Sequence, residues 1–282
     1  MRVLVNGLLQ FDSGKTTFSL SLLSTLRQNG IEFFPHKPVA GHNAWYSFST
    51  LLRSEELNAL VGNDALKYYD EIMRYKSEKS GIINIINEIN PFAVLLAPPD
   101  LQKINFDVRL YKELINEGVI VMLRVFDCES VFHFSLQGFE KIVPDSLTGK
   151  VLHLKKIFKA TEISKEKLRE LVDSSPAITE KCTRRVFQNY KNVLIESYND
   201  ALSPNYTSLD VDLMFVVTPG KAFLIEEFKK VIGLFTYPPW LVSVSSFMKY
   251  VKVVRSWNIE VGRYQLNDNL LDFILKFIDK NE

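Results

Sequence analysis

The sequence predicts an α/β fold with a mainly parallel, doubly wound sheet and helices on both faces. Three observations support this fold class. Strand-like apolar runs alternate with helical patterns along much of the chain. The runs 192–196 and 211–217 are almost continuously apolar, as in parallel strands that are buried on both faces. At the amino end, a strand, a loop containing Gly14-Lys15-Thr16 and a helix follow one another, which is how phosphate-binding loops are built.

Strands are expected, in chain order, at 2–6, 31–35, 192–196 and 211–217. The first is an apolar run that leads directly into the loop. Pro38, shortly after the second strand, stops that strand from continuing, because proline removes a hydrogen-bond donor from the ladder. Ligands of open parallel sheets bind at the carboxyl ends of the strands, so the segments just after these strands are the ones to examine.

Helices are expected at 15–28, 64–78, 177–190, 221–231 and 267–279. The first carries apolar residues at helical spacing: Phe18, Leu20, Leu22, Leu23 and Leu26. In the last helix, charged residues interrupt the apolar run, so a core-packed helix is expected there rather than a membrane anchor.

We expect one domain over residues 1–282, with an insertion or elaboration at about 103–170. The chain has 282 residues, of which 46% are hydrophobic, enough for one large core. The stretch 119–126 is strongly apolar, and the Lys/Glu-rich run 154–170 is interpreted as a solvated helix face.

Net charge and cysteine usage restrict the class of partner. A formal net charge of +1 supplies little field for nucleic-acid or membrane binding, so neither is expected as a partner. Cys128 and Cys182 lie far apart without a metal-binding pattern, and we interpret them as reduced thiols of a cytoplasmic protein. The strand that begins at residue 2 argues against a signal peptide.

The loop after the first strand is the candidate nucleotide site. Free backbone N–H groups and the positive end of the following helix would converge there on a polyphosphate. Lys15 would reach the β- and γ-phosphates, and the Thr16 hydroxyl would complete a Mg²⁺ shell. The glycine usually found five positions before Gly14 is Leu9 here, and Gly7 stands two residues earlier. The expected nucleotide-binding residues are Gln10, Phe11, Asp12, Ser13, Gly14, Lys15, Thr16 and Thr17.

The second strand is followed by a cationic and polar segment. Lys37 would face the phosphate loop and neutralise a transferring phosphoryl group, so Lys15 and Lys37 are the candidate catalytic residues. His36, His42 and Asn43 are weaker candidates for substrate contacts, since single histidines more often make structural hydrogen bonds.

Carboxylates at two positions are candidates for holding Mg²⁺ together with Thr16. Glu196 ends a buried strand, where an unpaired carboxylate would be costly. Asp64 stands where a helix should begin, so its alternative role is an N-cap. Asp100 and Asp127 also end apolar runs and are weaker metal candidates.

Several segments together resemble the dethiobiotin synthetase family of P-loop NTPases. These are the 7–17 loop, Lys37-Pro38-Val39, the stretch 63–66 and the strand 193–196, with weaker similarity at 90–99 and 217–221. The resemblance implies an ATP-dependent ligase in which a carboxylate or carbamate attacks the γ-phosphate. It assigns Lys15 and Lys37 to that phosphate and Thr16, Asp64 and Glu196 to Mg²⁺, and it implies a homodimer.

The chain also departs from that family. The family has a glycine-rich turn after the strand-ending glutamate, whereas this chain has Ser197-Tyr198-Asn199-Asp200. The biotin-precursor substrate therefore does not follow, and a different small acceptor is expected.

Two other functions stay open. One is a regulatory ATPase or GTPase that acts as a switch with a protein partner; many such proteins carry an extra lysine early in the loop, where this chain has Leu8, Leu9 and Gln10. The other is a polynucleotide 5′-kinase, because 12–16 also resembles the loop of those enzymes, although the net charge does not favour it.

Overall fold

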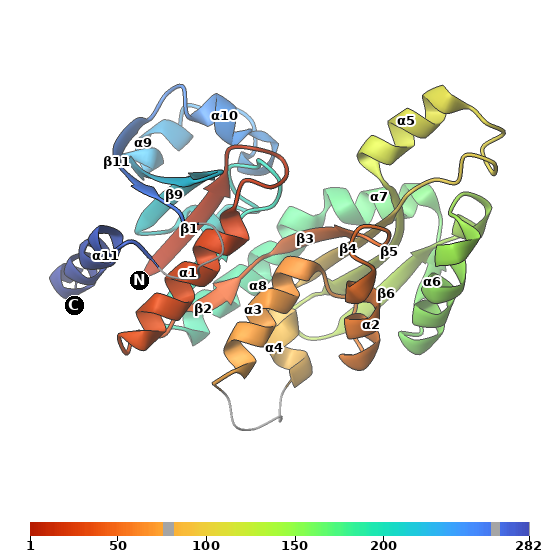
Figure 1. The fold of residues 1–282 in the computed structure, drawn as a ribbon, viewed down its shortest axis with the longest axis horizontal. Helices are drawn as coiled ribbons and strands as arrows, with labels where there is room; N and C mark the ends of the chain where they lie inside the picture. The colour runs from red at the N-terminus through yellow and green to blue at the C-terminus, as the bar shows by residue number, and fades with distance from the viewer. Residues whose placement is uncertain (76–81, 261–265, 282) are drawn as a thin grey trace. The chain divides into compact units, whose positions relative to one another are not determined.

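The chain forms two compact units, each built around its own sheet. The structure is a computed structural model that describes residues 1–75, 82–260 and 266–281. Unit 1 comprises Met1–Pro38 and Thr179–Glu282, and unit 2 comprises Val39–Ile178 (Figure 1). The segment 103–170, expected as an elaboration, lies inside unit 2.

The sheet of unit 1 contains six strands in the order β11-β10-β9-β1-β8-β2. The four strands β9, β1, β8 and β2 run parallel, and β10 and β11 continue the sheet in antiparallel pairing. Their bounds are β1 Arg2–Gly7, β2 Phe34–His36, β8 Val193–Glu196, β9 Leu213–Thr218, β10 Lys221–Glu226 and β11 Lys252–Asn258.

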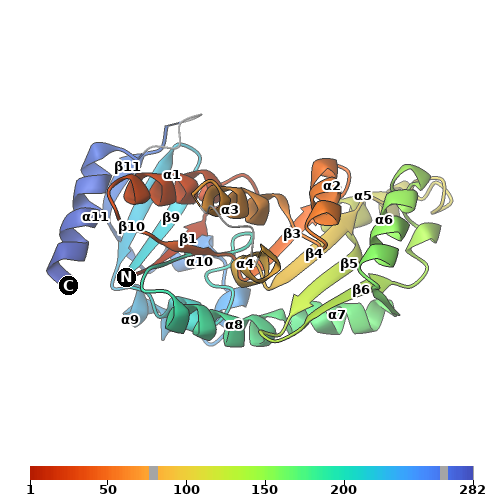
Figure 2. The ribbon, with the colours of Figure 1, turned by 90° about the horizontal axis from the view of Figure 1, so that it is seen from below.

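Helices cover both faces of this sheet. Figure 2 shows α1 (Lys15–Gln28) on one face and α8 (Ser175–Asn189) on the other. Phe18 of α1 packs on Phe215 of β9 with ring centroids 5.3 Å apart. Burial of one such side chain is worth roughly 1.5–3 kcal/mol, so this contact helps to fix α1 against the sheet. The remaining helical segments are α9 Phe228–Ile232, α10 Val244–Phe247, α11 Asp268–Asn281, η2 Thr207–Leu209 and η3 Pro239–Leu241.

The prediction of a helix at 221–231 is wrong. Residues Lys221–Glu226 form β10, and only Phe228–Ile232 is helical. The turn Thr218-Pro219-Gly220 closes a hairpin with β9, and Gly220 has a φ of 79°. Ala222 and Leu224 are buried on β10 at the two-residue spacing of a strand. The Pro-Gly turn signal should therefore have outweighed the helical pattern.

Unit 2 has a five-stranded sheet in the order β3-β4-β5-β6-β7. The outer pairs, β3 with β4 and β6 with β7, are parallel, and β5 is antiparallel to both its neighbours. The strands are β3 Val39–Asn43, β4 Phe92–Ala97, β5 Val119–Phe126, β6 Val131–Leu136 and β7 Thr161–Ile163. Its helical segments are α2 Phe48–Glu56, α3 Asn63–Met73, α4 Ile82–Ile89, α5 Val108–Glu117, η1 Phe139–Lys141, α6 Asp145–Ile157 and α7 Lys165–Asp173.

The α/β class is thus confirmed, but the single mainly parallel sheet is not. The protein has two sheets, and both are mixed. The apolar run 119–126 does form a strand, in the sheet of unit 2. Because β5 is buried along almost its whole length, its apolar run has no alternation that would distinguish it from a parallel strand.

Three other expectations concern helix ends, cysteines and membrane spans. The helix expected at 64–78 is α3, which ends at Met73; residues 76–78 lie outside the described residues.

Cys128 and Cys182 are buried, but neither is a free thiol, so the expectation of reduced thiols was wrong. Within the described ranges, no helix has the length and apolar character needed to cross a bilayer.

Candidate phosphate-binding site

The loop between β1 and α1 is closed by its own hydrogen bonds. Leu8 N donates to Val217 O at 3.0 Å, which ties the start of the loop to β9. The Ser13 hydroxyl donates to Leu9 O at 2.7 Å and accepts from Leu9 N at 3.1 Å. Gly14 then adopts a φ of 86°, which glycine accepts without strain, and α1 begins at Lys15. The sequence therefore shapes a compact turn directly before a helix N-terminus.

Gly7 is the glycine that permits close approach inside this loop. A Cβ at Gly7 would lie 2.5 Å from Ser13 Oγ and 2.7 Å from Lys15 Nζ. Both side chains therefore lie against the backbone at the end of β1. This accounts for a glycine at position 7 while position 9 is a half-exposed leucine.

The N-terminus of α1 has no acidic side chain in its first turn and no side-chain cap. Its positive end is therefore not neutralised by the helix itself, unlike that of α7, where Ser164 caps and Glu166 stands in the first turn. Lys15 is buried, and its ammonium donates to Asn199 O at 2.7 Å. A lysine and an uncapped helix end thus face the same loop.

Thr16, Lys37 and Glu196, three of the residues expected at the site, converge on one oxygen atom. Thr16 Oγ1 donates to Glu196 Oε1 at 3.1 Å, and Lys37 Nζ forms an ion pair with the same Oε1 atom. Glu196 ends β8, beside β1, and Lys37 directly follows β2 on the other side of β8. The order β1-β8-β2 therefore brings the three side chains to one edge of the sheet.

This ion pair is almost fully buried. The side chains of Lys37 and Glu196 are 5% and 0% exposed. Lys37 supplies the cation that a carboxylate at this position requires. Because charges in a buried pair depend on each other, removal of either partner would leave an isolated buried charge.

The oxygen atoms of Thr16 and Glu196 form a donor set that suits Mg²⁺. Magnesium commonly takes one or two protein oxygens and completes its shell with waters and phosphate oxygens. The part of the chain that the structure describes holds no group of three or more His, Cys, Asp or Glu side chains that could bind a metal. Thr16 and Glu196 are the oxygen-bearing residues at this site that could serve as protein ligands of such an ion.

The remaining loop residues are more exposed. Gln10, Phe11 and Asp12 are exposed, with the Phe11 side chain 63% accessible, and Thr17 is half-buried in the first turn of α1. Asp12 has a φ of 53°, in the left-handed region that aspartate tolerates better than most residues. These residues form the exposed rim of the loop. Ser13 and Lys15 of the loop, with the Lys37–Glu196 ion pair beside it, form the buried part of the site.

His36 has a partner inside unit 1. It is fully buried at the end of β2, and its Nε2 lies 2.9 Å from Thr183 Oγ1 of α8. This hydrogen bond directs one ring nitrogen toward α8.

The other expected site residues, His42, Asn43 and Asp64, belong to unit 2. His42 is buried, and neither ring nitrogen has a hydrogen-bond partner among the described residues. Burial, reinforced by Arg124 and opposed by Asp64, lowers the pKa of His42 to about 4, so its imidazole is neutral at pH 7. Asn43 Oδ1 accepts from Trp45 N at 2.9 Å, which is a turn contact. Asp64 is the acidic residue in the first turn of α3, and the N-cap position of that helix is Gly62 rather than Asp64.

Two polar features of the structure were not anticipated from the sequence. Arg124 is fully buried on β5 and donates to Asn87 Oδ1 at 2.5 Å and to both oxygens of Asn90. The Asn199 carbonyl that receives Lys15 was missed as well. The polar turn 197–200 could have indicated it, since Asn199 adopts a φ of 45° that asparagine tolerates. Arg124 gave no signal, because a single arginine in an apolar run looks like a strand end.

Comparison with family models, curated proteins and solved structures found no match to this chain.

Proposed function

We propose that unit 1 binds ATP with Mg²⁺ and transfers the γ-phosphate to a small carboxylate- or carbamate-like acceptor. The observation that carries this proposal is the convergence of Thr16 and Lys37 on Glu196 Oε1, beside a loop that holds Lys15 over Gly7. Binding of triphosphate alone needs the loop, Lys15 and a metal-organising hydroxyl. A second buried lysine at the neighbouring strand end is the feature expected of phosphoryl transfer.

Each residue of the site has a distinct role in this proposal. The backbone N–H groups of the loop and Lys15 hold the β- and γ-phosphates. Thr16 and Glu196 hold Mg²⁺, which when bound neutralises charge on the phosphates. Lys37 exchanges its carboxylate partner for a γ-phosphate oxygen, since both are anionic oxygens that an ammonium can pair with.

The proposed reaction is a single displacement at the γ-phosphorus atom. An acceptor oxygen forms a bond to phosphorus while the bond to the bridging oxygen breaks, and ADP leaves with that electron pair. Lys37 stabilises the charge on the transferring group. Removal of one such donor typically costs about 10²–10³ in turnover. The similarity of Lys37-Pro38-Val39 and 193–196 to dethiobiotin synthetases supports a carboxylate-like acceptor.

The experiment pairs an acceptor screen with two lysine variants. Small carboxylates and carbamates are screened for thermal stabilisation of the protein in the presence of Mg²⁺ and a non-hydrolysable ATP analogue, because a bound ligand raises stability by mass action. ATP turnover with the best acceptor is then measured for Lys37→Ala. We expect turnover to fall roughly 10²–10³-fold while the Kd for ATP changes only a few-fold.

Lys249→Ala serves as the matched control, because Lys249 is an exposed lysine of the same unit. It should leave binding and turnover unchanged. Equal loss of binding and turnover in Lys37→Ala would contradict a role in transfer. Hydrolysis that responds to protein partners but to no small acceptor would instead favour a nucleotide-driven switch.

A further inference from the structure

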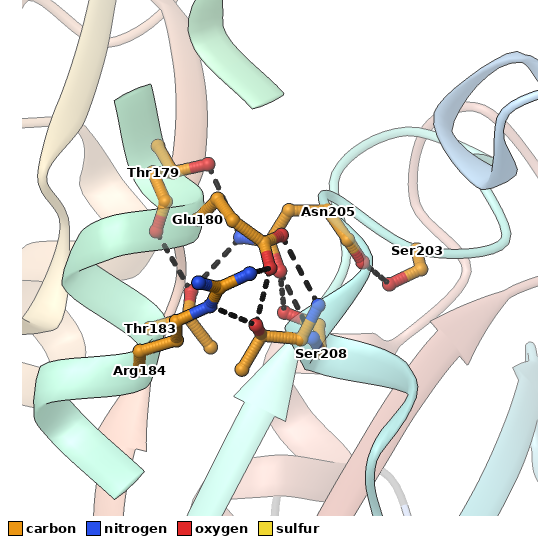
Figure 3. Close-up of polar contacts among 8 residues, drawn as sticks. Thr179, Glu180, Thr183, Arg184, Ser203, Asn205 and Ser208 are labelled. Atoms are coloured by element: carbon orange, nitrogen blue, oxygen red, sulfur yellow. Dashed lines mark hydrogen bonds and ion pairs between the residues drawn. The ribbon is translucent and has the colours of Figure 1, made fainter. Parts of the chain in front are cut away.

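We infer that Thr183 is a positioning residue for the proposed transfer site, and that it holds His36 with a proton on Nε2. This inference rests on the proposed function for its catalytic consequence. Its structural part rests only on hydrogen bonds within unit 1. Thr183 lies on α8, in a buried polar network that joins this helix to the loop after β8 (Figure 3).

The backbone N–H of Ser208 can only donate a hydrogen bond. The Asn205 side-chain atom 2.9 Å from Ser208 N must therefore be the oxygen Oδ1. The Ser208 hydroxyl donates to the same oxygen at 2.8 Å. The amide group of Asn205 is thereby fixed, with Nδ2 facing α8.

Because its orientation is fixed, Asn205 Nδ2 donates toward α8. Its two acceptors are Thr183 Oγ1 at 2.9 Å and Thr179 Oγ1 at 3.2 Å. The single hydrogen of the Thr183 hydroxyl is used elsewhere, since Oγ1 donates to the Thr179 carbonyl at 3.0 Å. A carbonyl oxygen cannot donate in return.

The proton on His36 follows from this count. Thr183 Oγ1 has one hydrogen and two lone pairs, and the hydrogen and one lone pair are already used. His36 Nε2, 2.9 Å away, must therefore donate to the remaining lone pair. The imidazole carries its proton on Nε2, and this tautomer is set by Ser208 through Asn205 and Thr183.

The network connects the two segments that carry the ion pair of the site. His36 directly precedes Lys37, and in β2 it pairs with Ile195 of β8, the residue before Glu196. Asn205 belongs to the loop that follows Glu196. Thr183, His36, Asn205 and Ser208 are all fully buried, so water does not compete for these hydrogen bonds. Thr183 thus ties both strand ends to α8.

The same network contains its own control. Thr207 Oγ1 accepts from Arg184 Nε at 3.3 Å and forms a short hydrogen bond with Glu180, and Thr207 itself is half-buried. Its hydroxyl makes no hydrogen bond to His36. Thr183→Val and Thr207→Val each remove one threonine hydroxyl from the network, but only the first removes the hydroxyl that lies 2.9 Å from His36 Nε2.

The test is nitrogen NMR of histidine-labelled protein, with His36→Gln to assign the resonance. We expect a His36 Nε2–H signal, protected from exchange, in the wild type, in Thr183→Ser and in Thr207→Val, and its loss in Thr183→Val. This readout needs neither nucleotide nor activity, so it separates failure of the inference from failure of the proposed function. A proton on Nδ1 alone in the wild type would overturn the inference, even if Thr183→Val does not fold.

The catalytic part is measured on the same variants. Thr183→Val should lower kcat about 10-fold to 100-fold, as expected for a misplaced reacting group, with the Kd for ATP within twofold of the wild type. Thr183→Ser should restore most of kcat, and Thr207→Val should retain it. Equal kcat values for Thr183→Val and Thr207→Val would overturn the positioning role.

Discussion

Lys37 in unit 1 and Arg124 in unit 2 are both buried cations, but their partners differ in charge. Lys37 pairs with the Glu196 carboxylate at the end of β8, next to the phosphate loop. Arg124, in the middle of β5, donates to neutral oxygens of Asn87 and Asn90. Across residues 1–75, 82–260 and 266–281, no carboxylate forms an ion pair with Arg124.

The difference separates a cation that suits chemistry from one that suits structure. An ammonium held by a carboxylate can exchange it for a phosphate oxygen, because the charge of the partner is conserved. A guanidinium held by three neutral oxygens joins Asn87 of α4 and Asn90, two residues before β4, to β5 and has no anion to exchange. Burial lowers the pKa of Arg124 to about 9, so it still carries its charge at neutral pH.

The largest expected effect is a loss of stability on replacing Lys37, which a second substitution at Glu196 should partly restore. Lys37→Met leaves the Glu196 carboxylate buried without its cation, which should destabilise the protein by about 3–5 kcal/mol. Adding Glu196→Gln removes the isolated charge and should recover a large part of that loss. Urea unfolding of the single and double variants measures both values.

Arg124→Met provides the contrast. It leaves only neutral oxygens unpaired, so Glu196→Gln should not recover its loss of stability. If Lys37→Met and the double variant were equally stable, Glu196 would not be a costly isolated charge in the absence of Lys37, which would contradict this prediction.

The next effect concerns glycines, one from each unit. Gly7→Ala places a Cβ against Ser13 and Lys15, and we expect at least about 100-fold weaker ATP binding, or roughly 2.7 kcal/mol. Gly149→Ala, in α6, meets no atom within 4 Å and should stabilise that helix by about 0.5–1 kcal/mol. Calorimetric titration and thermal unfolding compare the two. Unchanged ATP affinity in Gly7→Ala would show that the closed loop is not the binding site.

A third effect is acid destabilisation that originates in unit 2. Burial lowers the pKa of His133 to about 3 and that of His42 to about 4, from 6.5. As the pH falls, these histidines are protonated in the unfolded chain at a higher pH than in the folded protein. Their contribution to stability is therefore fully present above pH 6.5. It should fall by about 1.4 kcal/mol per pH unit for each histidine as the pH drops from 6.5 toward 4.

Two histidine variants test this slope. His42→Gln should reduce the acid slope by the share of one histidine. His133→Gln should reduce it by a similar share, because burial also lowers the pKa of His133. An identical slope in wild type and His42→Gln would exclude His42 as a source of acid sensitivity.

The smallest effect compares helix starts. Ser164 Oγ accepts from Lys167 N at the N-cap of α7, whereas α1 has no side-chain cap. Ser164→Ala should cost about 1 kcal/mol of unfolding free energy without changing ATP affinity. Thermal unfolding and titration on the same variant check both parts, and weaker nucleotide binding would contradict the assignment of the site to α1.

Local sequence patterns predicted the first helix and the parallel strands of unit 1 well. The expected helix 15–28 coincides with α1, and the expected strands overlap β1, β2, β8 and β9. The convergence of Thr16, Lys37 and Glu196 could also be anticipated, because strand ends gather at one edge of a parallel sheet.

Features that depend on long-range pairing could not be predicted in this way. The hairpin of β9 and β10 overrode a helical pattern, and the division into two mixed sheets depends on which strands pair. The roles of Thr183 and Asn205 likewise arise from contacts between residues 22 positions apart, and each looks like an ordinary polar residue in the sequence.

Calorimetric titration of ATP with Mg²⁺ into the folded 282-residue chain tests whether the loop of unit 1 binds a nucleoside triphosphate. We expect saturable heat for the wild type and its loss in Lys15→Ala, with Lys249→Ala behaving as the wild type. Absence of heat from well-folded wild-type protein with either ATP or GTP would contradict this expectation.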